Sequence, residues 1–239
     1  RELDAGNREE QTRLREVHAG KSAKELMSFA EARRNATKLD FDATTSPRPD
    51  SFGRREWREI DLGEIREYID WTFFFSAWEL KGKYPKILDH PKYGEAAREL
   101  YAHGTELLDE IIRDRALVAN AATGFWPANS DGDDIIVWAD TERNRELLRF
   151  PMLRQQNAQP AGKPNRSLAD YIAPLDSGVE DWIGAFAVTA GLGADELAAR
   201  YERDHDDYKA IMVKALADRL AEALAEMMHA RARTAWGYG

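Results

Sequence analysis

The stretch GFWPANSDGDDIIVW, residues 124–138, holds two apolar segments on either side of an Asp131-Gly132 turn signal. Apolar segments that flank a glycine turn are typical of a β-hairpin, because glycine adopts the backbone angles that tight turns require. The stretch therefore predicts an antiparallel hairpin. Its aromatic residues are expected in the sheet core and not on a stacking platform for bases.

Helical patterns lie on both sides of this hairpin. Apolar spacing predicts one helix over residues 93–115 and a helical region over residues 194–233 that breaks near His205. A shorter helix is expected to start at an N-cap on Thr72 and to close at Gly82.

The segment WIGAFAVT, residues 182–189, is short and apolar, which predicts an inner strand. Strands and helices are mixed without a regular βαβ alternation, so the fold class is expected to be α+β. A strand followed by glycines over residues 185–193 leaves a Rossmann-type methyltransferase open as an alternative. That alternative is disfavoured, since the glycine fingerprint is incomplete and no second βαβ unit follows.

Composition excludes several classes of protein. The chain has 239 residues, a formal net charge of -9 and no cysteine. Acids and bases are interspersed, so nucleic acid is not expected as a partner, and thiolate metal sites and disulfides are ruled out. No apolar run approaches the roughly 20 residues that span a bilayer, and the N-terminus lacks the apolar core of a signal peptide. No membrane association and a cytoplasmic location are the expectations.

The chain is expected to divide near Trp57. Residues 1–34 are charged and predict an exposed helical arm, and the sequence TTSPRP within residues 35–54 blocks regular structure. The predicted parts are an arm and linker over residues 1–56 and one compact domain over residues 57–239. Because the chain lacks an initiator Met and stops directly after a long helical pattern, it is expected to be a piece of a larger protein.

Asp70 is the first candidate site residue. It lies in an aromatic block over residues 68–85, and a carboxylate buried there would need a cation or hydrogen-bond donors to replace water. Two interpretations are open: Asp70 caps the following helix, or it binds a ligand as an anion.

Glu222 is the second candidate. Helical spacing predicts an apolar arc on the last long helix, with three charged residues inside or beside it: Arg219, Glu222 and Glu226. The apolar arc consists of Tyr208, Ile211, Met212, Ala215, Leu216, Leu220, Ala223, Leu224 and Met227. The plain alternative is an internal ion pair between Arg219 and Glu222, three residues apart.

No metal site is expected. The sequence His205-Asp206-Asp207 could suggest ligands, but the five histidines are scattered and cysteine is absent. Acidic residues there are expected to organise the start of the long helix, near its positive end.

Several stretches, taken in order, carry a family resemblance. They are IDWT (69–72), WELKGKYP (78–85), FWPANS (125–130), LRQQ (153–156), LADYIAP (168–174), DWIGAFAVT (181–189) and HDDYKAIMVKALADRLAEA (205–223). Together they resemble the S-adenosylmethionine-binding activation domain of cobalamin-dependent methionine synthase. The resemblance covers residues 69–238, and the arm before it resembles the linker from that enzyme's cobalamin domain.

The resemblance implies a C-shaped domain built on a twisted antiparallel sheet with flanking helices, preceded by the helical arm. It implies reductive methylation: S-adenosylmethionine presents its methyl group to oxidised cobalamin held by a neighbouring domain, and flavodoxin or a related reductase supplies an electron. No catalytic acid or base is expected. The cofactors carry the chemistry, and the protein supplies position and electrostatics.

The resemblance also assigns residues. Asp70 matches the family's contact to the α-ammonium group of the cofactor, Glu222 matches a residue lining the cofactor site, and Asp218 matches a position that faces the docked cobalamin domain. For Asp218 the plain alternative is a solvated partner of Lys214.

The chain departs from the family pattern at several points. Phe73 stands where the family usually has proline at the start of a helix, and Ser167 stands where it often has cysteine. The family's Arg-Pro-x-Pro-Gly-Tyr stretch, the Asp-x-His-x-x-Gly cobalamin motif and the zinc-binding cysteines are absent. The domain is therefore expected to be incomplete at its C-terminus, with zinc only elsewhere in the parent enzyme. A noncatalytic docking module for a cobalamin domain is the other alternative.

Overall fold

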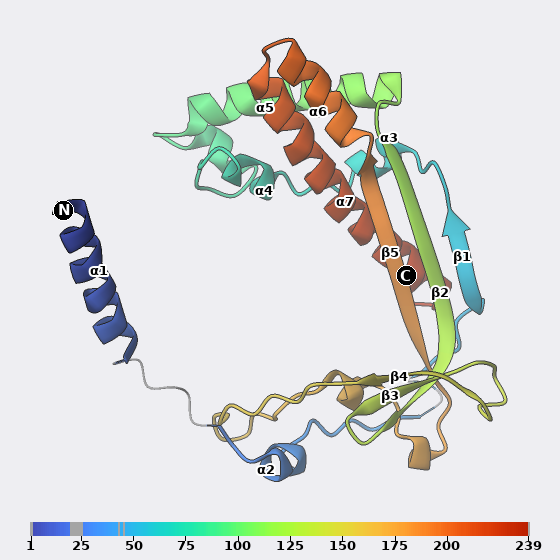
Figure 1. Cartoon of the computed structure of the whole chain (residues 1–239). Coiled ribbons are helices and arrows are strands. Elements are labelled where there is room, and N and C mark those ends of the chain that lie inside the picture. Colours follow the sequence, from blue (N-terminus) through green and yellow to red (C-terminus); the bar gives the residue numbers. More distant parts are fainter. Residues whose placement is uncertain (1, 20–25, 43, 45, 239) are drawn as a thin grey trace.

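The computed structural model describes residues 2–19, 26–42, 44 and 46–238. Long strands connect a group of helices at one end of the molecule to a layer at the other end, formed by residues 134–177 and called the lower layer below (Figure 1). The helices and the lower layer project toward the same side, so the chain outlines a C (Figure 1). All strand pairs in the described part are antiparallel. The expected α+β fold is confirmed, and the Rossmann-type alternative, which requires parallel strands, is wrong.

The elements follow one another without βαβ repeats. The α-helices are α1 Glu2–Ala19, α2 Phe29–Arg34, α3 Leu62–Arg66, α4 Trp71–Ser76, α5 Gly94–Asp114, α6 Ala194–Arg203 and α7 Asp207–Ala235. The strands are β1 Gly53–Trp57, β2 Val118–Asp131, β3 Asp134–Trp138, β4 Glu146–Pro151 and β5 Asp181–Leu192. Short 3-10 helices are η1 Lys86–Asp89, η2 Leu168–Tyr171 and η3 Leu175–Ser177.

Strand β2 is the centre of the sheet. It pairs with β1, β3 and β5, and β4 extends the sheet beyond β3. Asp131 pairs with Asp134 across a two-residue turn, in which Gly132 has φ of 64°. Because that angle favours glycine, the sequence fixes the turn locally, and the predicted hairpin is confirmed.

The prediction of an inner strand at residues 182–189 is wrong. Within the described part β5 pairs with β2 alone, and its middle is exposed, including Phe186. The apolar composition of β5 reflects two buried ends, at Trp182 and Ala190. Periodicity along one strand cannot reveal how many neighbours that strand has.

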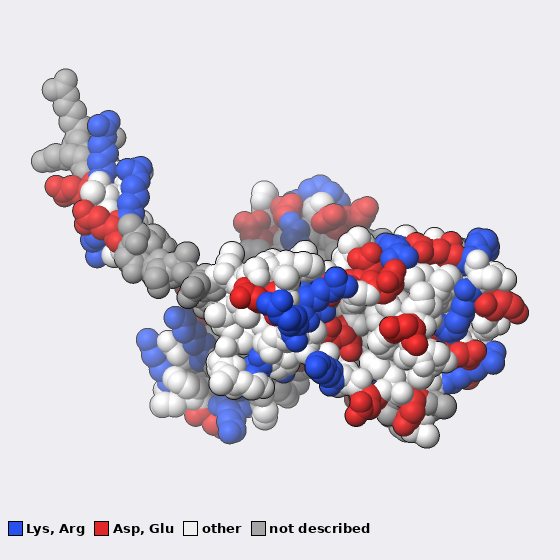
Figure 2. All heavy atoms as spheres, turned by 90° about the horizontal axis from the view of Figure 1, so that it is seen from below, with Lys and Arg blue, Asp and Glu red and all other residues white. Residues whose placement is uncertain are grey.

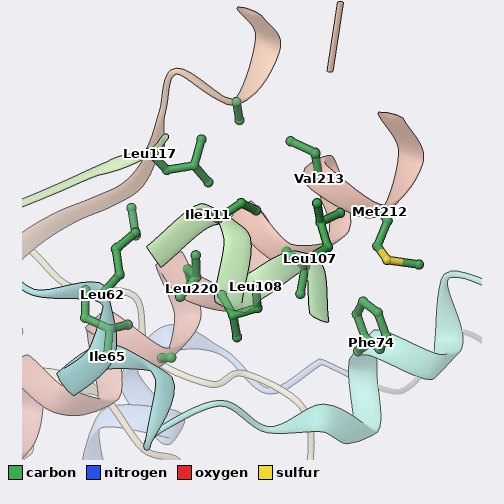
Figure 3. Close-up of a cluster of buried hydrophobic side chains, with 14 of the residues drawn as sticks. Leu62, Ile65, Phe74, Leu107, Leu108, Ile111, Leu117, Met212, Val213 and Leu220 are labelled. Carbon is green, nitrogen blue, oxygen red and sulfur yellow. The ribbon is translucent and has the colours of Figure 1, made fainter. Parts of the chain in front are cut away.

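The main core is built from α3, α4, α5, α6 and α7, and the sheet contributes Ala119, Ala121 and Ala190 to it. Figure 3 shows part of this core, including Leu108, Ile111 and Leu220. Helix α5 buries Leu100, Leu107, Leu108 and Ile111 at helical spacing, as predicted. Helix α7 follows a break at His205, which has φ of 60°, and the side chain of Asp206 accepts a hydrogen bond from the backbone of Lys209. The predicted break and helix start are confirmed.

The apolar arc predicted for α7 is partly wrong. Tyr208 and Ile211 are exposed, whereas Val213 and Met228 are buried. The buried face is therefore rotated from the expected one, and Glu222 and Glu226 lie on the exposed side. Helix α7 packs against strand β5 and against α3, α4, α5 and α6, and these contacts between distant segments decide which of its faces is buried.

The helix predicted from Thr72 to Gly82 is shorter and starts earlier. Its N-cap is Asp70, and it ends at Ser76. The residues up to Gly82 form turns that the Tyr84 backbone N–H fixes by donating to Thr72 Oγ1 over 3.2 Å. Phe73 is consequently the third residue of the helix, where the backbone N–H lacks an intrahelical partner and proline is tolerated.

The arm does not stay exposed along its whole length. Met27 N–H donates to the Gln156 carbonyl, and the side chain of Asn35 donates to Lys163 and Asn165. The chain segment of residues 26–42 thus contacts the lower layer, which Figure 1 shows beside α2. The division of the chain at Trp57 stays a prediction.

The surface carries both signs of charge. In the view from below, groups of Lys and Arg lie beside groups of Asp and Glu, and among the described residues neither sign covers this face (Figure 2). In the part of the chain that the structure describes, no helix is long and apolar enough to cross a membrane.

Candidate functional site

The predicted site residues lie where α4 contacts the middle of α7. Asp70 precedes α4, Phe73 lies within it, and α7 carries Asp218, Arg219 and Glu222. Helix α4 is anchored on its core side, because Trp71, Phe74 and Phe75 are buried in the main core. The start of α4 is thereby fixed in position against α7.

Asp70 is exposed, so the expectation of a buried carboxylate is wrong. Trp71, Phe74 and Phe75 turn into the core, whereas Tyr68, Phe73 and Asp70 remain exposed. Its Oδ1 accepts a hydrogen bond from the Thr72 backbone N–H over 2.8 Å, which is the geometry of an N-cap. Asp70 Oδ2 makes no hydrogen bond within the described residues, so the cap leaves one carboxylate oxygen available.

Arg219 joins the two other predicted residues. Its Nη1 donates to Glu222 Oε2, and its Nη2 donates to Asp218 Oδ2 over 2.6 Å. The internal pair of Arg219 with Glu222, the plain alternative for Glu222, is therefore present. The alternative partner for Asp218 is wrong, because Lys214 Nζ instead pairs with Glu202 Oε1 over 3.3 Å.

Phe73 connects α4 to this group of charges. The guanidinium carbon of Arg219 lies 5.4 Å from the centroid of the Phe73 ring, within reach of a cation–π contact. Sequence reasoning treated Phe73 only as a departure from a family pattern. No local sequence signal marks this contact, because Phe73 and Arg219 lie on helices that are far apart in the sequence.

The structure thus brings Asp218, Arg219, Glu222 and Phe73 into contact. It records no direct contact between Asp70 and either acid of α7 in the described part of the chain. Three exposed carboxylates and one guanidinium give this region two net negative charges, which favours a cationic ligand.

A tyrosine pair supports α4 from the other side. Tyr84 and Tyr101 stack with ring centroids 5.3 Å apart and share a hydrogen bond of 3.3 Å between their hydroxyls. This hydrogen bond, together with burial, raises the pKa of Tyr101 to about 12. Tyr101 also packs edge-on against Trp71, so the pair fixes the first residue of α4.

A cavity of about 560 Å³ lies farther along α7, between its last turns and strand β5. Phe125, Phe186 and Trp236 form aromatic walls, while His229 and Arg233 supply polar groups. Sequence reasoning missed this cavity, because β5 and the end of α7 meet only in the fold. Asp70, Asp218 and Glu222 do not line it.

No group of three or more His, Cys, Asp or Glu side chains is arranged to hold a metal ion in the residues described by the structure. Asp206, which a metal site at His205 would require, instead caps α7.

Two comparisons with known proteins give similar results. The family described as vitamin B12 dependent methionine synthase, activation domain, matches residues 61–239. A solved structure, the crystal structure of the MetH reactivation domain bound to AdoHcy, is similar to this chain with 43% sequence identity and a TM-score of 0.84. The match covers 89% of this chain and 65% of that one, so this chain spans a little less than two thirds of the solved domain.

Proposed function

This chain belongs to the activation-domain family of vitamin B12 dependent methionine synthase, and on that premise we propose that it binds S-adenosylmethionine where α4 meets α7. The observation that carries the proposal is the similarity to a reactivation domain bound to AdoHcy, which is S-adenosylmethionine without its transferable methyl group. The parent enzyme is a methyltransferase, and the chain acts as one part of it.

The residues fit such a ligand in charge. S-adenosylmethionine carries a sulfonium and an ammonium group against one carboxylate, so its net charge is positive near neutral pH. The site carries an excess of carboxylate, with an available oxygen on Asp70, Asp218 and Glu222. We assign Asp70 to the α-ammonium group, where a charge-assisted hydrogen bond forms, and Glu222 to the wall of the site.

The chain's own residues bind and orient the ligand. S-adenosylmethionine supplies the methyl group, cobalamin held by a neighbouring domain receives it, and a reductase such as flavodoxin supplies an electron. Asp218, which is more exposed than Glu222, is assigned to the surface that meets the cobalamin domain. The protein contributes orientation and charge complementarity, which are effective when groups are fixed before the ligand arrives.

Titration calorimetry with S-adenosylmethionine tests the proposal. It is run on this chain and on the same chain extended at its carboxyl end by the corresponding segment of the similar reactivation domain. Binding to either chain supports the proposal. Absence of binding to both chains, with a cobalamin domain still bound, would favour the docking-module alternative.

Two substitutions of Asp70 separate its cap role from a ligand role. Asn caps helices about as well as Asp, so Asp70→Asn keeps the bond to Thr72 and removes only the charge. We expect it to weaken binding roughly tenfold with an unchanged unfolding temperature. Asp70→Ala should lose both functions and about 1 kcal/mol of stability. If Asp70→Asn binds S-adenosylmethionine with full affinity, Asp70 acts only as a helix cap.

Glu222→Gln has a matched control on the same helix. Glu226 lies one turn farther along α7 and is also exposed, but it pairs with no residue in the described part of the chain. Glu222→Gln should weaken S-adenosylmethionine, and Glu226→Gln should not. A loss of thermal stability in Glu222→Gln without a loss of affinity would support the internal ion pair instead.

A further inference from the structure

Arg219 is enclosed although it lies between exposed residues. Its side chain is 12% exposed, whereas those of Asp218 and Glu222 are 74% and 54% exposed. A guanidinium on a solvated helix face normally extends into water, because it loses little by doing so. Here it is held between two carboxylates and one aromatic ring.

The two ion pairs use different ends of the guanidinium. Nη2 bonds Asp218 and Nη1 bonds Glu222, so a single planar cation spans both acids. A planar fork with several donors is specific to arginine, and lysine offers only a point charge. The bridge therefore depends on the shape of the side chain as well as on its charge.

Phe73 covers this bridge from α4. Its ring lies 5.4 Å from the guanidinium carbon, and Phe73 is itself 55% exposed, so this contact lies at the surface of the molecule. An aromatic face attracts a guanidinium and removes water from one side of it. Ion pairs strengthen where the local dielectric falls.

Each acid uses one oxygen on Arg219 and keeps the other. Among the described residues, Asp218 Oδ1 and Glu222 Oε1 make no hydrogen bond. Bonding one oxygen of a carboxylate fixes its rotamer, so the remaining oxygen is directed before any ligand binds. A side chain already fixed in its bound conformation loses less entropy on binding.

We propose that Arg219 is a positioning residue for the ligand site, that it holds the carboxylate of Glu222 in its ligand-binding orientation while Asp218 anchors the other end of the guanidinium, and that Phe73 shields it from water. This inference rests on the proposed function, because it concerns the same S-adenosylmethionine site. It adds two residues, Arg219 and Phe73, that act through their neighbours without touching the ligand.

A double-mutant cycle tests the role of Arg219, with S-adenosylmethionine affinity measured by calorimetry on whichever of the two chains above binds. Arg219→Met should weaken binding about tenfold, and Arg219→Lys should restore only part of that loss, since lysine cannot span both acids. If Arg219 acts through Glu222, adding Arg219→Met to Glu222→Gln should cost little more than Glu222→Gln alone.

Arg149 provides the matched control. It also pairs with several acids, Asp131, Asp134 and Glu146, but lies on β4 in the lower layer. Arg149→Met should leave the affinity unchanged. Independent, multiplicative effects of Arg219→Met and Glu222→Gln, or a loss of stability at unchanged affinity, would overturn the positioning role.

Phe73 is tested separately. Phe73→Ala should weaken binding about twofold to fivefold, as expected for one cation–π contact, and should make the affinity fall more steeply with added salt. Phe150→Ala, at a partly exposed phenylalanine of β4, should change neither quantity. An unchanged salt dependence in Phe73→Ala would contradict the shielding.

The outcomes separate this inference from the proposed function. If Glu222→Gln weakens binding and Arg219→Met does not, the inference is overturned and the proposed function stands. Absence of binding to both unsubstituted chains would overturn the function and the inference together.

Discussion

Arg154 Nη2 lies 2.6 Å from Asp170 Oδ1, and this ion pair ties the lower layer of the molecule together. The Arg154 side chain is 2% exposed, and it bonds Asp133 as well. Asp170 in turn accepts hydrogen bonds from the backbone N–H groups of Ser167 and Thr37. A buried network thereby joins the β2–β3 turn, the start of η2 and the segment that follows α2.

Removing one partner of this network should destabilise the protein. Arg154→Met leaves Asp170 without its cation and Asp133 with only the longer contact to Arg33 Nε, 3.7 Å away, and breaking a buried pair costs about 3–5 kcal/mol. The free energy of unfolding, measured with urea, should fall by that amount. Arg149→Met, which removes a partly exposed arginine whose ion pairs are screened by solvent, should change it much less.

The same network predicts a loss of stability in acid. Burial acts to raise the pKa of Asp170, but the hydrogen bonds from Arg154, Ser167 and Thr37 outweigh it and hold that pKa below its ordinary value. A carboxyl whose pKa is lowered by folding stabilises the protein above the ordinary pKa. That contribution should disappear as pH falls below about 4 and through the folded pKa. Asp170→Asn should flatten this part of a urea-midpoint profile against pH.

The hydrogen bond between Tyr101 and Tyr84 predicts a loss of stability at high pH. Its pKa of about 12 lies above the ordinary 10.0, so the pair with Tyr84 stabilises the fold below pH 10 and loses that effect as pH rises toward 12. Tyr84→Phe removes the shared hydrogen bond and should lower the pKa of Tyr101. Ultraviolet titration of tyrosinate, with Tyr101→Phe as the difference reference, measures this shift. Titration of Tyr101 near pH 10 in the unsubstituted protein would contradict it.

The substitution Gly104→Ala should destabilise the protein, although glycine-to-alanine changes usually stabilise a helix. Ala is the better helix former, yet a Cβ at Gly104 in α5 would lie 2.6 Å from the Phe74 ring. Phe74 is buried, so the ring cannot move away without disturbing the core. Gly104→Ala should lower the free energy of unfolding by about 1–3 kcal/mol. Gly6→Ala in α1, where a Cβ has open space, is the control and should not destabilise the fold.

Arg143 is expected to stabilise the pairing of two strands that are distant in the sequence. Its Nη1 donates to Asn129 Oδ1 over 2.7 Å and its Nη2 donates to the Asp181 carbonyl over 2.8 Å, so it joins β2 to the first residue of β5. Arg143→Lys keeps a charge but loses the fork, and should cost about 1–3 kcal/mol of unfolding free energy. Faster amide exchange at the paired ends of β2 and β5 would locate the loss. An unaltered exchange pattern would show that Arg143 does not hold these strands.

The sequence by itself determined the elements whose signals are local. Gly132 places the hairpin turn, the spacing of apolar residues defines α5, and the His205 region breaks the last helical segment, because each depends on backbone angles or side-chain periodicity within a few residues. The resemblance in short motifs also identified the family, and it predicts site roles for the acids at positions 70, 218 and 222.

Only the tertiary structure decided how those acids are used. Asp70 is exposed and caps α4, Glu222 and Asp218 share Arg219, and Phe73 covers that arginine from another helix. The same holds for β5, which is an edge strand despite its apolar sequence. These outcomes depend on which helix face is buried and on how many neighbours a strand has. Contacts between distant segments set both, and no local pattern encodes them.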